Sequence, residues 1–231
     1  MTKVKILAMS DTHNESLKDI IGSQTADIFI HCGDWTMLGN FQELSMMRDY
    51  IKEVRGQCDH FLWIVGNHDL GFEDYPHLAD EFADMTNTTY LHDRGKEVMG
   101  IKFWGSNYVP EIGNWAFMYS RPTERWKIIP DDTQILVTHG MPYKVLDGIP
   151  RGYSKTKLEH VGCRDLKHRI DQLKSLKVFL GGHLHEGRDI NGGRHHESGV
   201  DFYNCSIMNE MYYPTNKPQI IEVCTENMLN G

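Results

Sequence analysis

The sequence of 231 residues predicts an α/β fold in which a largely parallel β-sheet, flanked by helices, packs against a second sheet. Three observations lead to this fold class. Five short apolar runs are bounded by turn residues, as strands buried on both faces are. Helical patterns separate the first of these runs, which predicts parallel strands joined by right-handed crossovers. Runs nearer the C-terminus alternate apolar and polar residues, which is typical of antiparallel strands with one solvated face.

The first half of the chain alternates predicted strands and helices. Val4–Met9, Ile28–Cys32 and Phe61–Val65 are the first three apolar runs. Apolar residues at three- and four-residue steps predict a helix from about Gln42 to Val54, between the second and third strands. Pro76 predicts the first turn of a further helix, because the first turn leaves its N–H groups unpaired and proline has none.

The middle of the chain has a different pattern. Thr88–His92 and Val98–Trp104 predict two neighbouring strands, and Asp93-Arg94-Gly95 is the expected turn between them. This pair marks the point where the regular alternation of strand and helix stops.

The second half contains the other two apolar runs, Ile135–Val137 and Val178–Leu180. A helical stripe from Leu166 to Leu176 precedes the last run. The alternating segments that follow predict an antiparallel second sheet packed on the first. These segments are Arg188–Ile190, Val200–Cys205 and Gln219–Val223.

Composition and charge limit the classes of function. No repeat or Ser/Gly-rich linker divides the chain, so we expect residues 1–231 to form a single domain. The net charge of −8 argues against an extended nucleic-acid partner and against attraction to an anionic membrane. The five cysteines are scattered without a Cys-x-x-Cys pair, which favours a reducing compartment. The sequence shows no signal-peptide pattern and no apolar stretch that could span a bilayer, so we expect a cytoplasmic protein without a membrane partner.

Each of the five apolar runs ends, at its C-terminal edge, in residues that bind metal ions. Ligands of open α/β sheets bind just beyond the carboxyl ends of the strands, so we expect one site at one edge of a sheet. A turn or a capped loop would explain any one motif, but five in this arrangement favour a binding site. His183 and His185 are expected to point the same way, because they lie two residues apart on a strand edge. In order, the motifs are Asp11-Thr12-His13, Gly33-Asp34, Gly66-Asn67-His68-Asp69, Thr138-His139-Gly140 and Gly182-His183-Leu184-His185.

The donor atoms in these motifs indicate the kind of metal site. They are carboxylates, an amide and imidazoles without a thiolate, which excludes a structural cysteine-type zinc site. Seven donors exceed the needs of one tetrahedral ion and suit two divalent ions that share a carboxylate. The mixed oxygen and nitrogen set favours Mn, Fe, Zn or Co over Mg or Ca, and we favour manganese. The candidate ligands are Asp11, His13, Asp34, Asn67, His139, His183 and His185.

Taken in order, the five motifs resemble those of the calcineurin-like metallophosphoesterase superfamily, over residues 9 to 187. The resemblance is strongest to one branch, the small metallophosphoesterase-domain proteins of animal brain and their microbial and viral relatives. It implies a four-layer αββα sandwich of two mixed β-sheets. The segments that point to this branch are Cys32-Gly33-Asp34-Trp35-Thr36, Phe103-Trp104-Gly105, Thr138-His139-Gly140-Met141-Pro142 and His185-Glu186-Gly187.

The resemblance also implies a separate role for each residue of the site. Asp34 would bridge the two ions, and a hydroxide held between them would attack phosphorus in line. His68 would lie outside the metal shell and stabilise the transition state or protonate the leaving oxygen, with Asn67 beside it on the substrate. Asp69 would orient the imidazole of His68. The first ion would take Asp11, His13, Asp34 and His185, and the second Asp34, Asn67, His139 and His183.

Three departures from other family members narrow the expected activity. Some animal members of the same branch carry glycine at the position of His183, so its presence here predicts a fully competent site. Protein serine/threonine phosphatases have an arginine after Gly-Asp and another before Gly-Asn-His-Glu, and neither arginine is present here. Purple acid phosphatases place a metal-binding tyrosine where this chain has Met37, which argues against their ferric-tyrosinate centre.

Three functions remain open at this point. The leading expectation is a phosphodiesterase acting on small nucleotide-type esters such as a cyclic nucleotide, with a small phosphoester as its only expected partner. A nuclease acting on DNA or RNA and a scaffold that keeps the fold without catalysis are the alternatives. A nucleobase would need a stacking surface, although packing in the core is the favoured explanation of the same aromatic residues. Those residues are Trp104, Tyr108, Trp115 and Phe117.

Overall fold

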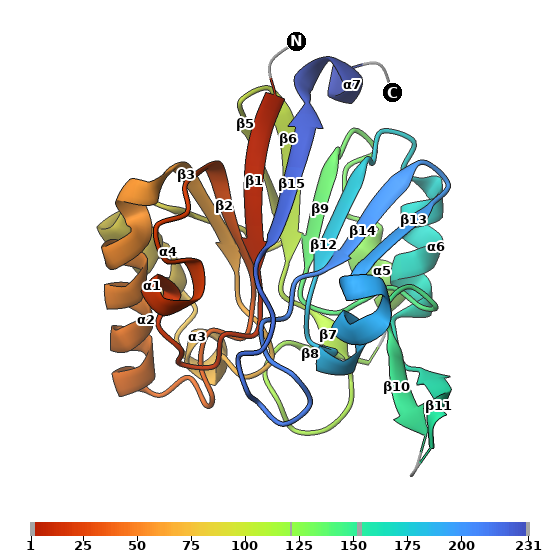
Figure 1. The fold of residues 1–231 in the computed structure, drawn as a ribbon, viewed down its shortest axis with the longest axis horizontal. Coiled ribbons are helices and arrows are strands. Elements are labelled where there is room, and N and C mark those ends of the chain that lie inside the picture. The colour runs from red at the N-terminus through yellow and green to blue at the C-terminus, as the bar shows by residue number, and fades with distance from the viewer. Residues whose placement is uncertain (1–2, 121, 152–153, 230–231) are drawn as a thin grey trace.

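Two β-sheets face each other in the computed structural model, which describes residues 3–120, 122–151 and 154–229, and helices cover their outer faces (Figure 1). Three buried apolar clusters fill the spaces between the layers. The four-layer αββα sandwich with two mixed sheets is therefore confirmed. Representative members are Phe29 and Met47 in the cluster under the first helical layer, Ile30 and Val137 in the cluster between the sheets, and Leu166 and Phe179 in the cluster under the second helical layer.

The first sheet has the strand order β15-β1-β2-β3-β4. Strands β1 to β4 are parallel, and β15 runs antiparallel to β1 at the edge. The strands are β1 (Lys3–Met9), β2 (Ala26–Cys32), β3 (Cys58–Ile64), β4 (Thr89–Tyr90) and β15 (Gln219–Cys224).

The second sheet has the strand order β13-β14-β12-β9-β6-β5. Its four inner strands are parallel, and β13 and β5 are antiparallel edges. The strands are β5 (Arg94–Val98), β6 (Ile101–Ser106), β9 (Ile135–Thr138), β12 (Val178–Gly181), β13 (Arg194–Glu197) and β14 (Val200–Asn204).

The remaining elements are two short strand pairs and the helices, most of which lie on the outer faces of the sheets. Two short strand pairs, β7 (Val109–Pro110) with β8 (Met118–Tyr119) and β10 (Gly148–Arg151) with β11 (Ser154–His160), stand apart from the main sheets. The α7 helix (Thr225–Leu229) follows β15. The first face carries α1 (Leu17–Ile21), α2 (Phe41–Val54), α3 (Leu70–Asp74) and α4 (His77–Thr86), and the second carries α5 (Pro122–Trp126) and α6 (Arg164–Gln172).

The α2 helix illustrates how local sequence sets these elements. The Asn40 side chain accepts hydrogen bonds from the backbone N–H groups of Gln42 and Glu43, and the Glu43 side chain accepts one from the Asn40 N–H. This capping box satisfies donors that the first turn leaves unpaired. Leu44 and Met47 on the inner face are buried against the first sheet. The predicted helix is confirmed within one residue of its expected start.

Strand β4 lies within the expected Thr88–His92 and β6 overlaps the expected Val98–Trp104, but the expected pairing of these two strands is wrong. The hairpin consists of β5 and β6, so Arg94 and Gly95 lie within a strand, and β4 belongs to the first sheet beside β3. The reversal occurs at Met99 and Gly100, whose φ angles are 52° and 77°. Positive φ at both central residues is the geometry that a tight two-residue hairpin turn requires.

The C-terminal segments also differ from expectation. Arg188–Ile190 lies in a 3₁₀ segment, η2 (His185–Gly192), which is interrupted by non-helical backbone at Ile190 and Asn191, in place of a strand. The buried Arg188 guanidinium donates hydrogen bonds to the carbonyls of Asn204 (3.3 Å) and Lys217 (2.8 Å), which holds this segment against the sheet edge. In addition, β14 is parallel to β12, and β15 joins the first sheet instead of the second.

None of the helices in the described part of the chain is long and apolar enough to cross a membrane. All five cysteines lie among the described residues as free thiols, four of them buried.

Candidate metal centre

The residues expected to bind metal converge at the carboxyl ends of strands from both sheets. Asp11 and His13 follow β1, while Asp34 and Asn67 follow β2 and β3 of the first sheet. His139 and the pair His183 and His185 follow β9 and β12 of the second sheet. The expectation of a site at one edge of one sheet is therefore wrong, because similar apolar runs do not reveal which sheet each strand enters.

Six of these residues form two groups. The Asp11 group consists of Asp11, His13 and His185, and the Asp34 group of Asp34, His139 and His183. Within each group, one ligand atom from each residue lies within 4.8 Å of the others. This is close enough for one cation to contact all three.

The two histidines that follow β12 do not point the same way, contrary to expectation. The strand ends at Gly181, His183 has a φ of 66°, and His185 begins the 3₁₀ segment. The two-residue alternation of a strand does not apply to such backbone. The divergence places one imidazole in each group.

Three of the imidazoles use the same ring nitrogen to bond to the backbone. A carbonyl oxygen only accepts hydrogen bonds, so each Nδ1 carries a hydrogen and each Nε2 is left to bind a cation through its lone pair once it has lost its own proton. Orientation of a ligating histidine by a carbonyl is a common arrangement around protein-bound metals. The bonds run from His13 to Thr36 (3.0 Å), from His139 to Cys32 (2.8 Å) and from His185 to Asn209 (3.0 Å).

The two groups meet at one carboxylate oxygen. Oδ2 of Asp34 lies 3.8 Å from Nε2 of His13 and 3.2 Å from Nε2 of His139. The His13 Nε2 atom is buried and has no hydrogen-bond partner. A buried nitrogen without a partner is costly unless a ligand satisfies it. Together with the oxygen and nitrogen donor set, this atom fits a pair of divalent cations that share Asp34.

The charges in the site are strongly coupled. Burial raises the pKa of Asp34, but the charge and hydrogen bond of His139, together with smaller contributions from His13 and His68, outweigh burial and hold that pKa well below its usual range. Burial lowers the pKa of His139, yet Asp34 raises it overall to about 9. Burial also raises the pKa of Asp11, whereas the hydrogen bond and charge of His185 bring it down to about 2. Both carboxylates are therefore ionised at neutral pH and attract cations.

Two other imidazoles are neutral at neutral pH. Burial lowers the pKa of His13 below its usual value and that of His183 to about 4. A neutral imidazole has the lone pair that metal binding requires.

Four of the candidate ligands have a strained, left-handed backbone conformation. The φ angles are 55° at Asp11, 42° at His13, 55° at Asp34 and 66° at His183. Residues other than glycine rarely adopt this region, and they cluster in it at functional sites. Gly66 permits the crowding around them, because a Cβ there would lie 2.2 Å from Oδ1 of Asp34.

Asn67 and His68 lie beside the two groups. The side-chain oxygen of Asn67 is 3.1 Å from Nε2 of His139, which places its amide at the Asp34 group. The backbone N–H of His68 donates to Oδ1 of Asp34 (2.9 Å), and its Nδ1 bonds to the Met37 carbonyl (2.8 Å). The imidazole of His68 therefore faces the site without belonging to either group.

Asp69 does not orient His68, contrary to expectation. Its carboxylate accepts hydrogen bonds from the backbone N–H groups of Gly66 (2.8 Å), Trp35 (3.3 Å) and Thr36 (2.9 Å). These bonds connect the loops that follow β2 and β3, and the Met37 carbonyl takes over the orienting role. Asp69 therefore holds the loop that presents the neighbouring ligands.

Of the four aromatic residues considered for stacking, only Trp115 packs against the site, at 4.2 Å from the His68 ring. Trp104 and Phe117 are buried in the core. The Tyr108 ring is half-buried, with the Arg125 guanidinium 3.7 Å from its centre.

Sequence reasoning missed Tyr212, whose ring centre lies 4.8 Å from that of His13 and 4.9 Å from that of His185. This tyrosine belongs to the loop 208–216, which we call the Asn209 loop. The Asn209 side chain shapes the loop by accepting hydrogen bonds from the N–H groups of Met211 (2.9 Å) and Tyr213 (3.0 Å). The only local signal is an asparagine that favours a turn, and nothing nearby in the sequence links it to His13.

Comparisons with known proteins agree with this geometry. The family model described as calcineurin-like phosphoesterase matches residues 4–187. Metallophosphoesterase domain-containing protein 1 of Homo sapiens is 28% identical and aligns with 96% of this chain and 71% of its own length. A UPF0046 protein of Caenorhabditis elegans is 32% identical over 81% of this chain and 65% of its own length.

Solved structures show the same fold. One crystal structure has a TM-score of 0.64 at 15% identity and covers 96% of this chain and 100% of that chain. The protein TT1561 of Thermus thermophilus has a TM-score of 0.59 at 16% identity, covering 88% of this chain and 89% of its own. Because the family model spans most of the sequence, the chain belongs to the calcineurin-like phosphoesterase family.

Proposed function

We propose that this chain is a phosphodiesterase that uses two divalent cations, with Mn²⁺ favoured, to hydrolyse small nucleotide-type phosphodiesters such as cyclic nucleotides. Membership of a metal-dependent phosphoesterase family supports the reaction class. The observation that carries the proposal is the position of Asp34 Oδ2 between Nε2 of His13 and Nε2 of His139. One carboxylate placed in this way links two cation sites, as two-metal phosphoryl transfer requires.

The proposed ligands follow from this placement. When bound, the two cations would activate water as the nucleophile and neutralise negative charge on the phosphoryl group. Asp11, His13 and His185 would hold the first cation, and Asp34 would be shared. The second cation would take His139 and His183 from the Asp34 group, together with the Asn67 amide next to them.

His68 is the proposed proton carrier. Its backbone N–H bonds to Asp34 and its Nδ1 to the Met37 carbonyl, so its position is fixed relative to the cation sites. The Trp115 indole stacks on the ring at 4.2 Å and limits its rotation. An imidazole fixed in this way can hold a proton at Nε2 and transfer it to the departing ester oxygen.

The position of Tyr212 favours a substrate that carries a planar group. It is 43% exposed, and its ring contacts imidazoles of the Asp11 group. An aromatic ring at the mouth of the site can stack against a nucleobase. The acidic net charge of −8 favours a small substrate over polymeric nucleic acid.

The test compares substrates with protein that has been stripped with a chelator and then loaded with Mn²⁺. We expect chelator-sensitive hydrolysis of bis-p-nitrophenyl phosphate, faster than that of p-nitrophenyl phosphate, and turnover of cyclic mononucleotides. Absence of any chelator-sensitive hydrolysis would support the scaffold alternative. Faster cleavage of oligonucleotides than of cyclic mononucleotides would support the nuclease alternative.

A further inference from the structure

An apolar cavity of about 280 Å³ opens directly beside the Asp34 group. His183 forms one wall, so the cavity and the group share a residue. The wall continues with Gly140, which follows the candidate ligand His139 in the chain. The other main lining side chains are Ile112, Met141, Ile149, Val161 and Leu184.

The chemistry of the lining selects apolar ligands. Apart from His183, the side chains named above are aliphatic or a thioether, so they offer no strong hydrogen-bond donors or acceptors. A nucleobase or sugar placed among them would lose hydrogen bonds to water without replacement. An alkyl or aryl group would be favoured there because it leaves water without that loss.

The size of the cavity is also suitable for an alkyl or aryl group. A protein cavity of about 150 Å³ lined by apolar residues is enough to hold benzene. The cavity of about 280 Å³ therefore has room for a phenyl ring or a chain of several methylenes. Ile112, which is 62% exposed, stands at its solvent-facing side.

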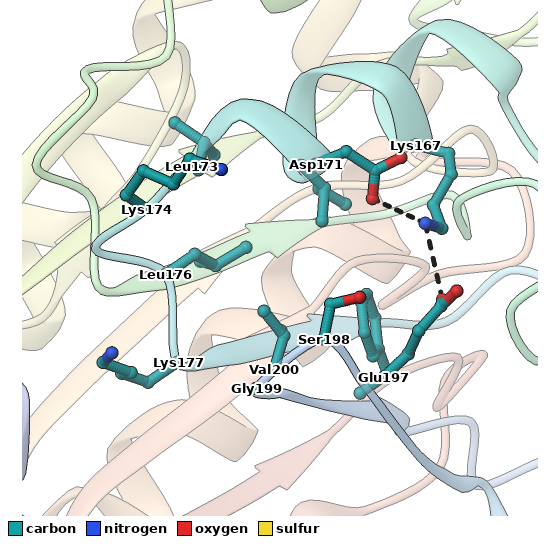
Figure 2. Close-up of a pocket in the computed structure, with 12 residues that line it drawn as sticks. Lys167, Asp171, Leu173, Lys174, Leu176, Lys177, Glu197, Ser198, Gly199 and Val200 are labelled. Atoms are coloured by element: carbon teal, nitrogen blue, oxygen red, sulfur yellow. Dashed lines mark hydrogen bonds and ion pairs between the residues drawn. The ribbon is translucent and has the colours of Figure 1, made fainter. Parts of the chain in front are cut away.

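A second cavity is larger but lies away from the candidate ligands. It measures about 460 Å³ and lies between α6 and the turn that joins β13 to β14. Lys167 pairs there with Asp171 and Glu197 (Figure 2). Its lining includes residues at the amino ends of β12 and β14, whereas the metal centre lies at the carboxyl ends. Of these two cavities, the smaller one adjoins the candidate ligands.

We propose that the cavity beside His183 binds an apolar ester substituent, so that among acyclic diesters the protein prefers those that carry one alkyl or aryl group. This inference rests on the proposed phosphodiesterase activity, because it assigns a place to one of the two groups that flank a diester phosphorus. The aromatic residues Trp115 and Tyr212 remain available to the other group.

The experiment uses alkyl p-nitrophenyl phosphates with methyl, butyl and hexyl groups, and phenyl p-nitrophenyl phosphate. All release p-nitrophenolate, so the leaving group is constant. We expect kcat/KM of the Mn²⁺-loaded protein to rise roughly ten- to fiftyfold from the methyl to the butyl ester, because each buried methylene favours binding. In Ile112→Asp and in Val161→Phe, which respectively charge and fill the cavity, the butyl-to-methyl ratio should fall towards one. Ile128→Asp, an exposed isoleucine outside the cavity lining, should keep the wild-type ratio.

Failure of this inference is distinguishable from failure of the proposed function. Hydrolysis of the methyl ester without a gain from longer chains, or an unchanged ratio in both cavity variants, would overturn the cavity assignment and leave the phosphodiesterase proposal standing. If no ester is hydrolysed, the phosphodiesterase proposal fails, and calorimetric binding of butylphosphonate against methylphosphonate tests the cavity independently. Equal affinity of the two phosphonates would overturn it.

Discussion

The Asp34 group is held together by the protein itself, whereas the Asp11 group has a nitrogen that only a ligand would satisfy. Both ring nitrogens of His139 are engaged, one by the Cys32 carbonyl and the other next to Asn67 and Asp34. In the Asp11 group, Nε2 of His13 has no partner. Each group contains an ion pair, since His185 pairs with Asp11 (3.5 Å), but the unpartnered His13 makes the Asp11 group depend more on the cation itself.

Removal of the residue that both groups share should have the largest effect. Asp34→Ala should abolish binding of both cations and reduce kcat/KM by more than the ~10²–10⁴-fold expected for loss of a proton carrier. Metal content by elemental analysis and hydrolysis of bis-p-nitrophenyl phosphate measure the two effects. Asp59→Ala, at an exposed aspartate, is the matched control. Two bound cations per chain in the Asp34 variant would refute the shared-ligand assignment.

His68→Ala should separate chemistry from metal binding. The substitution keeps the backbone N–H that bonds to Asp34 but removes the imidazole, so both cations should remain while kcat falls by ~10²–10⁴-fold. The same metal and rate measurements apply, with the exposed His60→Ala as control. Loss of metal along with activity would instead assign His68 a structural role.

The histidines of the two groups should contribute unequally to the free energy of unfolding. In metal-free protein, His139→Ala should cost ~3–5 kcal/mol of unfolding free energy, because it leaves the buried Asp34 without its counter-charge. His13→Ala should cost less, about 1–2 kcal/mol, because the lost hydrogen bond to Thr36 is accompanied by removal of an unpartnered nitrogen. Urea denaturation measures both values, and equal losses would contradict the proposed difference between the groups.

The smallest expected effect concerns the aromatic edge of the Asp11 group. Tyr212→Ala should raise KM for nucleotide substrates about fivefold or more, since stacking on a base contributes ~1–3 kcal/mol. Metal content should stay constant, and Tyr212→Phe, which keeps the ring, should restore KM. A similar rise in KM for methyl p-nitrophenyl phosphate, which lacks a base, would argue against stacking.

Local sequence patterns predicted most of the fold and the gathering of the site residues. Each motif directly follows an apolar run, so a strand end and its functional residue are read together, as with Asp34 after β2 and His139 after β9. Pairing between distant strands has no such local signal. The allocation of β9 and β12 to a separate sheet therefore escaped prediction.

Contacts that side chains make across loops could not be predicted from the sequence either. The carboxylate of Asp69 is adjacent in sequence to His68 but bonds to backbone groups that include Trp35 and Thr36, after another strand. Tyr212 reaches His13 from nearly the opposite end of the chain. Such contacts depend on the three-dimensional path of the loops, and no spacing rule encodes that path.

The pairing of β15 with β1 has a consequence for the order in which the molecule assembles. Val4 pairs with Val223, so the edge of the first sheet closes only after residue 223 has left the ribosome. The Asn209 loop immediately precedes β15 and supplies the carbonyl that orients His185. During synthesis, the Asp34 group could form on strands already made, while the Asp11 group would wait for this last segment. A nascent chain halted before residue 209 should thus expose an unfinished centre that lacks the contacts of the Asn209 loop.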